Sequence, residues 1–190
     1  MSNKVLFGLK NVHVALLTAE AGPTYGEPMA VPGGVNFTSN PDGGLNKFYA
    51  DNVAYFTTSD NNGYSGELEM ANITDEVLAA LLNWEIDDNG MLVEIADAQP
   101  AQFALLCEFA GDESARRVVY YNCVAARPGE AQATKGEQTT PSTRTLSLSI
   151  MPLAIDVLLD VKGAIEKTIA NSSVYEAWYE DVTLPSFAVS

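Results

Sequence analysis

The feature that most constrains the fold is a pair of neighbouring runs that are apolar on both faces. Residues 102–110 and 116–125 are separated by the short segment 111–115, a spacing typical of a β-hairpin. The apolar side chains of the first run are Phe103, Leu105 and Phe109 on one face and Ala104 and Leu106 on the other. A strand with two apolar faces is buried on both sides. We therefore expect this hairpin at the centre of a sheet that is covered twice.

The two cysteines of the chain lie one on each arm of this hairpin. With residues 111–115 as the loop, Cys107 pairs opposite Val119, and Cys123 pairs opposite Phe103. The thiols then share a face but stand four residues apart along it, which is too far for a disulfide. We predict two buried, reduced cysteines, and their spacing excludes a CxxC metal or redox site.

Two other segments predict strands that have one apolar and one wet face. Residues 64–72 and 144–151 alternate between apolar and polar side chains. The polar side chains are Ser65, Glu67 and Glu69 in the first segment and Thr145, Ser147 and Ser149 in the second. Such alternation is typical of a sheet with one face on the core and one in water.

Two helices are expected. Thr74 can cap the first, and the acids at 75–76 favour the positive end of its dipole. Its apolar stripe is Val77, Leu78, Leu81 and Leu82. We expect the acidic turn at 87–90 to end this helix. A short second helix is predicted near Ser173, which has capping-box spacing to Glu176.

Proline and glycine mark two long loops. Residues 21–44 hold four prolines and two Gly-Gly pairs, and residues 127–141 are polar with further Gly and Pro. Between them, residues 47–58 predict a strand that turns at 60–63 and returns along 64–72. A loop as long as 21–44 inside a compact domain usually has a function or wraps a partner.

These elements predict a mainly β, α+β domain. We expect a sandwich with one packed α-helix, long loops and a short C-terminal helix, beginning with a strand at 12–18. The 190 residues suffice for one well-cored domain, spanning 1–190. Within it, residues 21–46 are expected to form an extended loop or arm. Residues 152–190 form a C-terminal segment. The sequence predicts no secondary structure for its residues 152–170.

The charge balance argues against several classes of partner. The chain has 10 Lys and Arg against 25 Asp and Glu, a net charge of −15. Binding to nucleic-acid phosphates or to an anionic membrane needs clustered cations. The longest apolar stretch, 150–159, is interrupted by Pro152 and Asp156 and is too short to span a bilayer. Residues 1–10 lack the apolar run of a secretion signal, so we expect the chain to mature in the cytoplasm.

Sequence motifs for catalysis are absent. The single histidine, His13, lies in an expected strand and is interpreted as structural. Residues 85–90 place acids like the start of a calcium loop, but the twelfth position is Ala96 rather than glutamate. The pair Glu67 and Glu69 fits a solvated strand face better than two glycosidase carboxylates. We expect no enzyme activity, no cofactor and no metal site.

Charge is distributed unevenly along the chain. Residues 48–115 contain fourteen acids and no lysine or arginine, and seven of the ten cations follow from Arg116 onward. One interpretation is a solubilising acidic surface. The other is a polarity within the subunit that suits directional assembly of identical copies.

Several blocks of the sequence, in the same order, resemble those of one family. The blocks are Phe7-Gly8-Leu9-Lys10-Asn11-Val12-His13, Thr24-Tyr25-Gly26, Pro28, Pro32-Gly33, Phe48-Tyr49-Ala50-Asp51-Asn52, Asn61-Asn62-Gly63-Tyr64, Gly66-Glu67-Leu68-Glu69, Phe103-Ala104-Leu105-Leu106, Glu108-Phe109, Tyr121-Asn122-Cys123, Ala126-Arg127-Pro128 and Tyr175-Glu176-Ala177-Trp178-Tyr179. With them the chain resembles the major tail proteins, the tail-tube subunits of long-tailed, non-contractile (siphovirus-type) bacteriophages. The resemblance covers most of residues 5–151 and resumes near Tyr175.

The resemblance implies a tail-tube-type β-sandwich or barrel that assembles as hexameric rings stacked into a tube. DNA would leave the capsid through this tube without specific binding. The implied partners are further copies of the chain, a tape-measure protein and a tail-terminator protein, and no membrane. The implied location is the virion tail, with assembly in the cytoplasm of the host bacterium.

Two sets of residues are candidates for roles in such a tube. Like charge on a lumen wall repels DNA without adhesion, which makes Glu67 and Glu69 the candidate lumen-facing acids. The candidate arm between subunits contains Pro32, Gly33, Gly34, Pro41, Gly43 and Gly44. If this arm orders only on assembly, deletion of residues 33–44 should leave a folded subunit that does not polymerise.

Two alternatives remain open. The first is another tube or tail-completion protein of a phage or a secretion system, which would form single rings or other tubes. The second is a host-binding or sugar-binding sandwich module, which would need an exposed platform of aromatic side chains. Most aromatic residues of the sequence fall in apolar alternation or beside turns, which disfavours such a module.

Overall fold

A computed structural model describes residues 3–111, 113–130, 142–156 and 158–187 of the chain. The strands are β1 Leu6–Ala19, β2 Thr24–Tyr25, β3 Met29–Ala30, β4 Gly34–Asp42, β5 Leu45–Ala50, β6 Val53–Ser59, β7 Gly63–Met70, β8 Glu85–Ile86, β9 Leu92–Val93, β10 Gln102–Gly111, β11 Arg116–Ala125, β12 Arg144–Ile150, β13 Leu153–Ile155, β14 Leu158–Asp160 and β15 Lys162–Glu166. The helices are α1 Asp75–Leu82, α2 Ser172–Glu176 and the 3-10 turn η1 Ala177–Tyr179.

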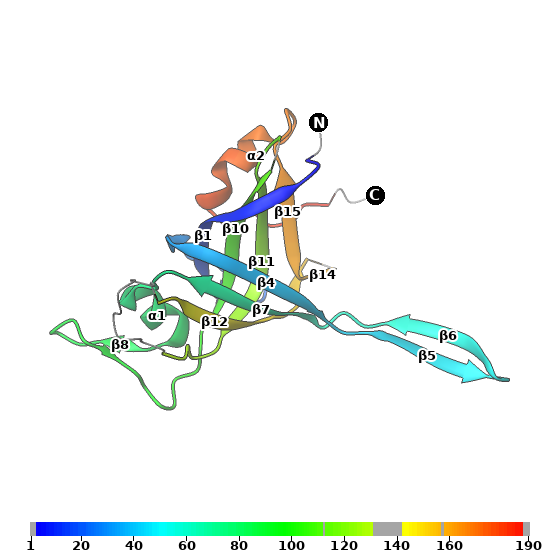
Figure 1. Cartoon of the computed structure of the whole chain (residues 1–190), viewed down its shortest axis with the longest axis horizontal. Coiled ribbons are helices and arrows are strands. Elements are labelled where there is room, and N and C mark those ends of the chain that lie inside the picture. Colours follow the sequence, from blue (N-terminus) through cyan, green and yellow to red (C-terminus); the bar gives the residue numbers. More distant parts are fainter. Residues whose placement is uncertain (1–2, 112, 131–141, 157, 188–190) are drawn as a thin grey trace, which may run out of the picture.

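A nine-stranded antiparallel sheet forms the body of the molecule. Its order is β2-β1-β10-β11-β12-β7-β4, with β3 paired to β1 and β15 paired to β11. The hairpin of β10 and β11 lies at the centre, as its two apolar faces predict. The helices α1 and α2 lie at opposite ends of these two strands, and the β5–β6 hairpin projects from the body (Figure 1).

The core has two parts, one on each face of the central hairpin. Phe103, Leu105 and Cys107 enter the first part, which α1 and the inner faces of β7 and β12 complete. Ala104 and Leu106 enter the second part, against β13 and the C-terminal helices. The expectation of a mainly β, sandwich-like domain with a packed helix and a short C-terminal helix is therefore confirmed.

The two strands predicted to have one wet face are β7 and β12. In β7, Leu68 and Met70 are buried while Glu67 is exposed. In β12, the buried side chains are Leu146, Leu148 and Ile150, and the polar residues between them face solvent. The two strands pair with each other in register along their length, so their wet faces are continuous.

The first helix is α1, as expected, and its stripe of Val77, Leu78, Leu81 and Leu82 is buried. Thr74 has the extended backbone of an N-cap, but its side chain makes no capping hydrogen bond. The helix ends earlier than predicted, at Asn83, which adopts a left-handed conformation with a φ of 52°. The acidic turn 87–90 instead joins β8 to β9. The Asp87 carboxylate there accepts hydrogen bonds from the backbone N–H groups of Asn89 and Met91, both at 2.8 Å.

The expectation of an extended loop over residues 21–46 is wrong. This segment contains β2, β3 and β4, and β4 pairs with β7 from Gly34 to Asp42 as the last strand of the sheet. An edge strand tolerates Pro41 because its outer side needs no ladder donor. Deletion of residues 33–44 would remove this strand, so we now expect it to disturb the fold itself.

The prediction of a single strand over residues 47–58 is also wrong. The chain turns back at Asp51 and Asn52, so that β5 and β6 form a hairpin of their own. The return strand β7 pairs with β4 and β12 rather than with this segment.

The prediction of two buried, reduced cysteines is confirmed, but one of the two predicted cross-strand partners is different. Cys123 lies opposite Phe103, whereas Cys107 lies opposite Val118 rather than Val119 because a bulge follows Phe103. Both cysteines are free and buried. Burial raises the pKa of the Cys107 thiol to about 12.

The C-terminal segment, for whose residues 152–170 the sequence predicts no element, adds a strand to the sheet. The strand β15 pairs with β11 from Arg116 to Tyr120, along the part of that edge that β12 does not use. The helix α2 begins at Ser172, and no side-chain capping bond is present at its start, so the predicted capping box does not form. The side chain of Asn171 is used elsewhere: it donates to the Glu166 carbonyl at 2.9 Å.

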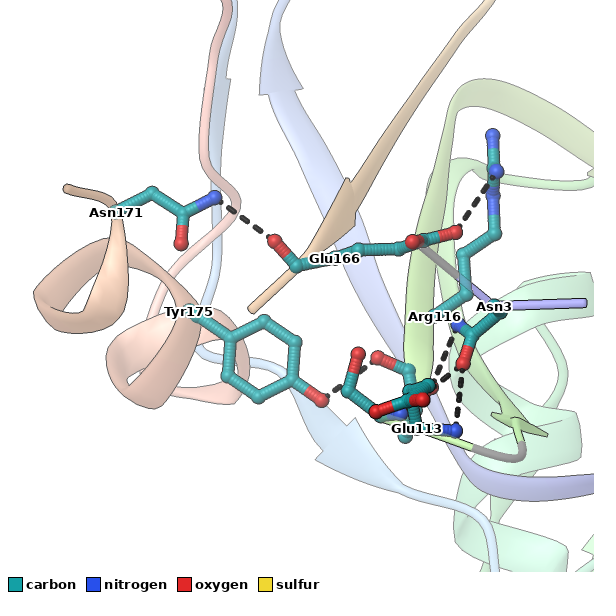
Figure 2. A network of polar contacts seen from close by, with 8 residues as sticks. Asn3, Glu113, Arg116, Glu166, Asn171 and Tyr175 are labelled. Carbon is teal, nitrogen blue, oxygen red and sulfur yellow. Dashed lines mark hydrogen bonds and ion pairs between the residues drawn. The ribbon is translucent and has the colours of Figure 1, made fainter. Parts of the chain in front are cut away.

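A polar network joins the turn between β10 and β11 to Asn3 and to the helix α2 (Figure 2). The Asn3 amide oxygen accepts hydrogen bonds from the backbone N–H groups of Glu113 and Ser114, each at 3.0 Å. The Tyr175 hydroxyl of α2 donates to the Ala115 carbonyl at 2.8 Å. The end of the sheet near α2 is therefore tied together by side chains from distant parts of the chain.

Candidate assembly surfaces

The β5–β6 hairpin is the most exposed element of the described chain. It continues the β4–β7 ribbon away from the body, so its strands lie beyond the sheet (Figure 1). Every residue from 45 to 59 is exposed except Ala50, which is half-buried. The body of the domain therefore does not cover either face of this hairpin.

Large apolar side chains line this exposed hairpin. They are Leu45, Phe48, Tyr49, Val53, Tyr55 and Phe56. Each of them is at least 59% exposed. A two-stranded hairpin on its own is only marginally stable in water, and a contiguous exposed apolar patch marks an interaction surface. The hairpin is therefore a candidate interaction surface.

Two glycines lie where β4 and β7 continue beyond the sheet into the β5–β6 hairpin. Gly43 and Gly63 have φ angles of +130° and +99°. A Cβ at Gly63 would lie 1.9 Å from the Ile150 carbonyl oxygen, and one at Gly43 would lie 2.2 Å from the Asp60 carbonyl oxygen. Both positions therefore need glycine for backbone conformation and for close approach.

The sequence contains a weak signal for this hairpin. Asp51 and Asn52 adopt φ angles of 51° and 62°, which is the left-handed pair that a type I′ turn requires. Asp and Asn tolerate that region better than other non-glycine residues. Flanking apolar residues on both sides of an Asp-Asn pair could have identified a turn here.

The candidate lumen acids lie on a wet face made by three strands. Glu67 has Thr38 and Ser147 as its cross-strand neighbours. Glu69 accepts a hydrogen bond from the Thr143 hydroxyl at 2.6 Å. The side chains of this face are Asn36, Thr38, Asn40, Ser65, Glu67, Glu69, Thr145, Ser147 and Ser149. Hydroxyl, amide and carboxylate groups make this face hydrophilic and negative, and none of these side chains is cationic.

The candidate arm residues lie in and around β4 and do not form a separate arm. Pro32 and Gly33 precede the strand, where the Gly33 carbonyl accepts a hydrogen bond from Ala71 N–H at 2.7 Å. Gly34 and Pro41 lie within β4. The pair Gly43-Gly44 forms the joint between β4 and the exposed hairpin. The role of these residues in contacts between subunits stays a prediction.

Most described cations after residue 115 are paired within the chain. The ion pairs are Arg116–Glu166, Arg117–Glu108, Arg127–Glu94, Arg144–Glu130 and Lys167–Glu176. A further cation, Lys162, lies over the Tyr64 ring at 4.7 Å. Within the described residues, the basic part of the sequence therefore offers little unpaired positive charge, and both interpretations of the charge distribution stay predictions.

His13 makes structural contacts. Its ring stacks on Tyr179 with 4.5 Å between centroids, and its Nδ1 lies 3.0 Å from the Asn11 carbonyl. Within the described ranges, no three His, Cys, Asp or Glu side chains are grouped so that they could hold a metal ion. The same residues include no helix that is long and apolar enough to cross a membrane.

Comparison with known proteins finds a likeness at the level of fold. No protein-family model matches the chain, and no curated protein matches it. Among solved structures, the chain is similar to the tube-terminating cap of the anti-feeding prophage, determined by cryo-electron microscopy. The match has a TM-score of 0.53 and 7% sequence identity, and it covers 88% of this chain and 95% of the cap. The two proteins thus share a fold over almost their whole lengths.

Proposed function

We propose that this chain is a structural subunit of a phage-type tail, and more specifically a tail-tube protein that polymerises with copies of itself. The observation that carries the proposal is the exposed apolar β5–β6 hairpin on a fold shared with a tube-terminating cap. The sequence blocks that resemble the tail-tube family include the hairpin tip, Phe48 to Asn52. Both lines of argument support a protein whose work is assembly.

The energetics of the hairpin support self-association. Full burial of one large apolar side chain contributes roughly 1.5–3 kcal/mol. Six such side chains on one hairpin can supply much of the free energy that a stable contact requires. Four of them are aromatic, which also meets one requirement of a sugar-binding platform. Their mixture with Leu45 and Val53 favours a protein surface as the partner.

The wet face of β4, β7 and β12 supports a role as the wall of a conduit. DNA carries one phosphate charge per about 1.7 Å of duplex axis, and cations on a wall would bind it. A face of hydroxyl and amide groups with Glu67 and Glu69 repels phosphate over roughly 8–10 Å at physiological salt. Hexameric rings stacked into a tube would line the bore with such faces, and DNA would pass without specific binding.

The remaining parts of the proposal concern setting and partners. We place the protein in the virion tail, with assembly in the cytoplasm of the host bacterium. Its partners would be further copies, a tape-measure protein inside the tube and a tail-terminator protein at its end. No catalytic step and no cofactor enter this function.

Electron microscopy of the purified protein tests the proposal. We expect rings or stacked tubes from the natural chain and dispersed monomers from the hairpin variant Phe48→Ser/Phe56→Ser. The control is Met91→Ser/Leu159→Ser, which removes two exposed apolar side chains from other surfaces and should assemble normally. Normal assembly of the hairpin variant would show that the hairpin is not the assembly element.

A tube-terminating cap is the second candidate function. The likeness to the anti-feeding prophage cap favours it, because nearly the whole of both chains is matched. A cap closes a tube end, so it is expected to form single rings, whereas a tube subunit forms long stacks. Long stacks in the same micrographs would exclude the cap, and single rings at every protein concentration would exclude the tube subunit.

A further inference from the structure

A second exposed apolar surface lies between the first part of β1 and the edge strand β4. Near His13 the strand β1 pairs with β3, and the last hydrogen bond there joins Val31 N–H to the Val12 carbonyl at 2.8 Å. Beyond it Gly34 packs directly on Leu9, since a Cβ at Gly34 would lie 3.0 Å from the Leu9 Cδ2. From that point β1 and β4 diverge without a ladder between them (Figure 1).

We call this region, residues 6–13 of β1 and 30–37 leading into β4, the β1–β4 seam. Two hollows of about 290 and 430 Å³ lie along it and share Leu9 in their walls. The smaller hollow is lined by Leu6, Phe7, Gly8, Leu9, Val35, Asn36, Phe37 and Phe109. Phe7 and Val35 are 60% and 50% exposed, so the seam presents apolar surface to solvent.

In the described chain, the backbone of the seam also has N–H and C=O groups without a neighbouring strand. Within the described residues, β4 is the last strand of the sheet and pairs only with β7. An edge strand of nine residues offers unpaired N–H and C=O groups to an added strand. A partner strand placed there would extend the sheet, and its side chains would reach the apolar hollows beside it.

The features of the seam match those of the β5–β6 hairpin. The hairpin has strands of six and seven residues and carries large apolar side chains on its surface. Its tip bears the carboxylate of Asp51, while the larger hollow of the seam is lined by the exposed Lys10. The hairpin of the same chain continues β4 outward and away from the seam (Figure 1). The hairpin that fills the seam must therefore come from another copy.

We propose that the β1–β4 seam of one subunit receives the β5–β6 hairpin of a second copy of this chain. The hairpin adds a strand to the free edge of β4 and seats aromatic side chains in the hollows beside Leu9. This inference rests on the proposed function, because it names where the assembly hairpin binds. The two surfaces differ, so the contact is head-to-tail and each bound subunit still offers a free hairpin or a free seam.

Mixing two complementary variants tests the inference. The hairpin variant Phe48→Ser/Phe56→Ser keeps its seam, and the seam variant Phe7→Ser/Val35→Ser keeps its hairpin. Each alone should associate at least about tenfold more weakly than the natural chain, because buried apolar area is lost. Mixed in equal amounts, they retain one intact hairpin–seam combination. Analytical ultracentrifugation should then show one-to-one dimers and nothing larger.

Cysteine cross-linking gives an independent readout. The natural cysteines are both buried, so they contribute no background. A mixture of Ala54→Cys and Lys10→Cys subunits should form a disulfide-linked dimer on mild oxidation, as the hairpin tip lies at the seam. A mixture of Ala54→Cys with Glu85→Cys, an exposed position on β8, should not.

The outcomes separate the inference from the proposed function. If the seam variant assembles like the natural chain and no cross-link forms, the seam is not the binding site and the inference is wrong. The proposed function would still stand if the hairpin variant failed to assemble. If the hairpin variant itself assembles normally, the inference is wrong and the hairpin is not the assembly element. The proposed function is contradicted if the natural chain forms neither rings nor tubes. Circular dichroism melting of each variant confirms that the subunits remain folded.

Discussion

Arg117 makes several side-chain contacts to the central hairpin and to the C-terminal helix α2. Its Nε donates to Glu108 at 3.0 Å, and its guanidinium lies 3.9 Å from the Tyr175 ring centroid and 4.9 Å from that of Tyr179. It also donates to the Tyr175 carbonyl. Glu108 is buried, so Arg117 pairs a buried carboxylate of the central hairpin while it also contacts the C-terminal helices.

Removal of one residue of this ion pair should therefore destabilise the fold. Arg117→Met leaves the Glu108 carboxylate buried without its ion pair, and we expect the free energy of unfolding to fall by about 3–5 kcal/mol in urea denaturation. The control Arg127→Met breaks an exposed pair with Glu94 and should change it by less than about 1 kcal/mol. Equal effects of the two substitutions would contradict the account.

The buried phenol of Tyr121 should make the fold less stable in alkali. Burial raises the pKa of its phenol to about 12, from an ordinary value of 10.0, and the Asp160 carboxylate adds to this shift. The neutral form is thus favoured in the folded state, so its contribution is complete below pH 10 and is lost as pH rises toward 12. Tyr121→Phe should show a smaller fall in the free energy of unfolding between pH 9 and about 11.5. An unchanged fall would contradict this role.

At the scale of elements, Gly63 joins the exposed hairpin to the sheet. Gly63→Ala brings a Cβ to 1.9 Å from the Ile150 carbonyl oxygen at a φ of +99°. We expect the free energy of unfolding to fall by about 1–3 kcal/mol or more. Gly44→Ala is the matched control, because a Cβ there meets nothing within 4 Å, and it should be nearly neutral. Thermal melting of both variants measures the difference.

Buried elements could be predicted from the sequence, while exposed ones could not. The strands β7 and β12 and the helix α1 carry a periodic apolar pattern, because one face of each meets the core, and β10 and β11 are apolar on both faces, because both meet it. Periodicity reports burial inside the chain. It cannot distinguish exposed apolar residues from apolar residues in the core, and so residues 47–58 predict one strand that returns along residues 64–72 rather than a hairpin of their own.

The edge strand β4 could not be predicted from the sequence for a different reason. β4 has the sequence GVNFTSNPD, which is poor in strand-forming residues and rich in turn-forming ones. Its strand conformation comes from pairing with β7, which supplies hydrogen bonds that no local pattern encodes. The candidate acids Glu67 and Glu69 could be placed on a wet face from alternation alone. Which partner that face meets is not a property of the strand's own sequence.

At the scale of the whole molecule, the wet face of β4, β7 and β12 predicts an effect on DNA passage. Glu67→Lys/Glu69→Lys should leave assembly intact and slow genome ejection from the phage, most strongly at low salt, where charge is least screened. The control Glu85→Lys/Asp88→Lys makes the same change in net charge at the β8–β9 turn and should eject normally. Ejection at the natural rate by the first variant across salt concentrations would show that these acids do not line the bore.

Hydrogen exchange measured by mass spectrometry on the monomeric and the assembled protein tests the central claim most directly. The backbone amides of residues 45–59 lie in a solvent-exposed hairpin in the isolated subunit and should exchange rapidly there. On assembly we expect their exchange to slow by at least about tenfold, while the amides of α1, already packed in the core, stay unchanged. Equally fast exchange of the hairpin in both states would contradict the claim that the β5–β6 hairpin assembles this protein.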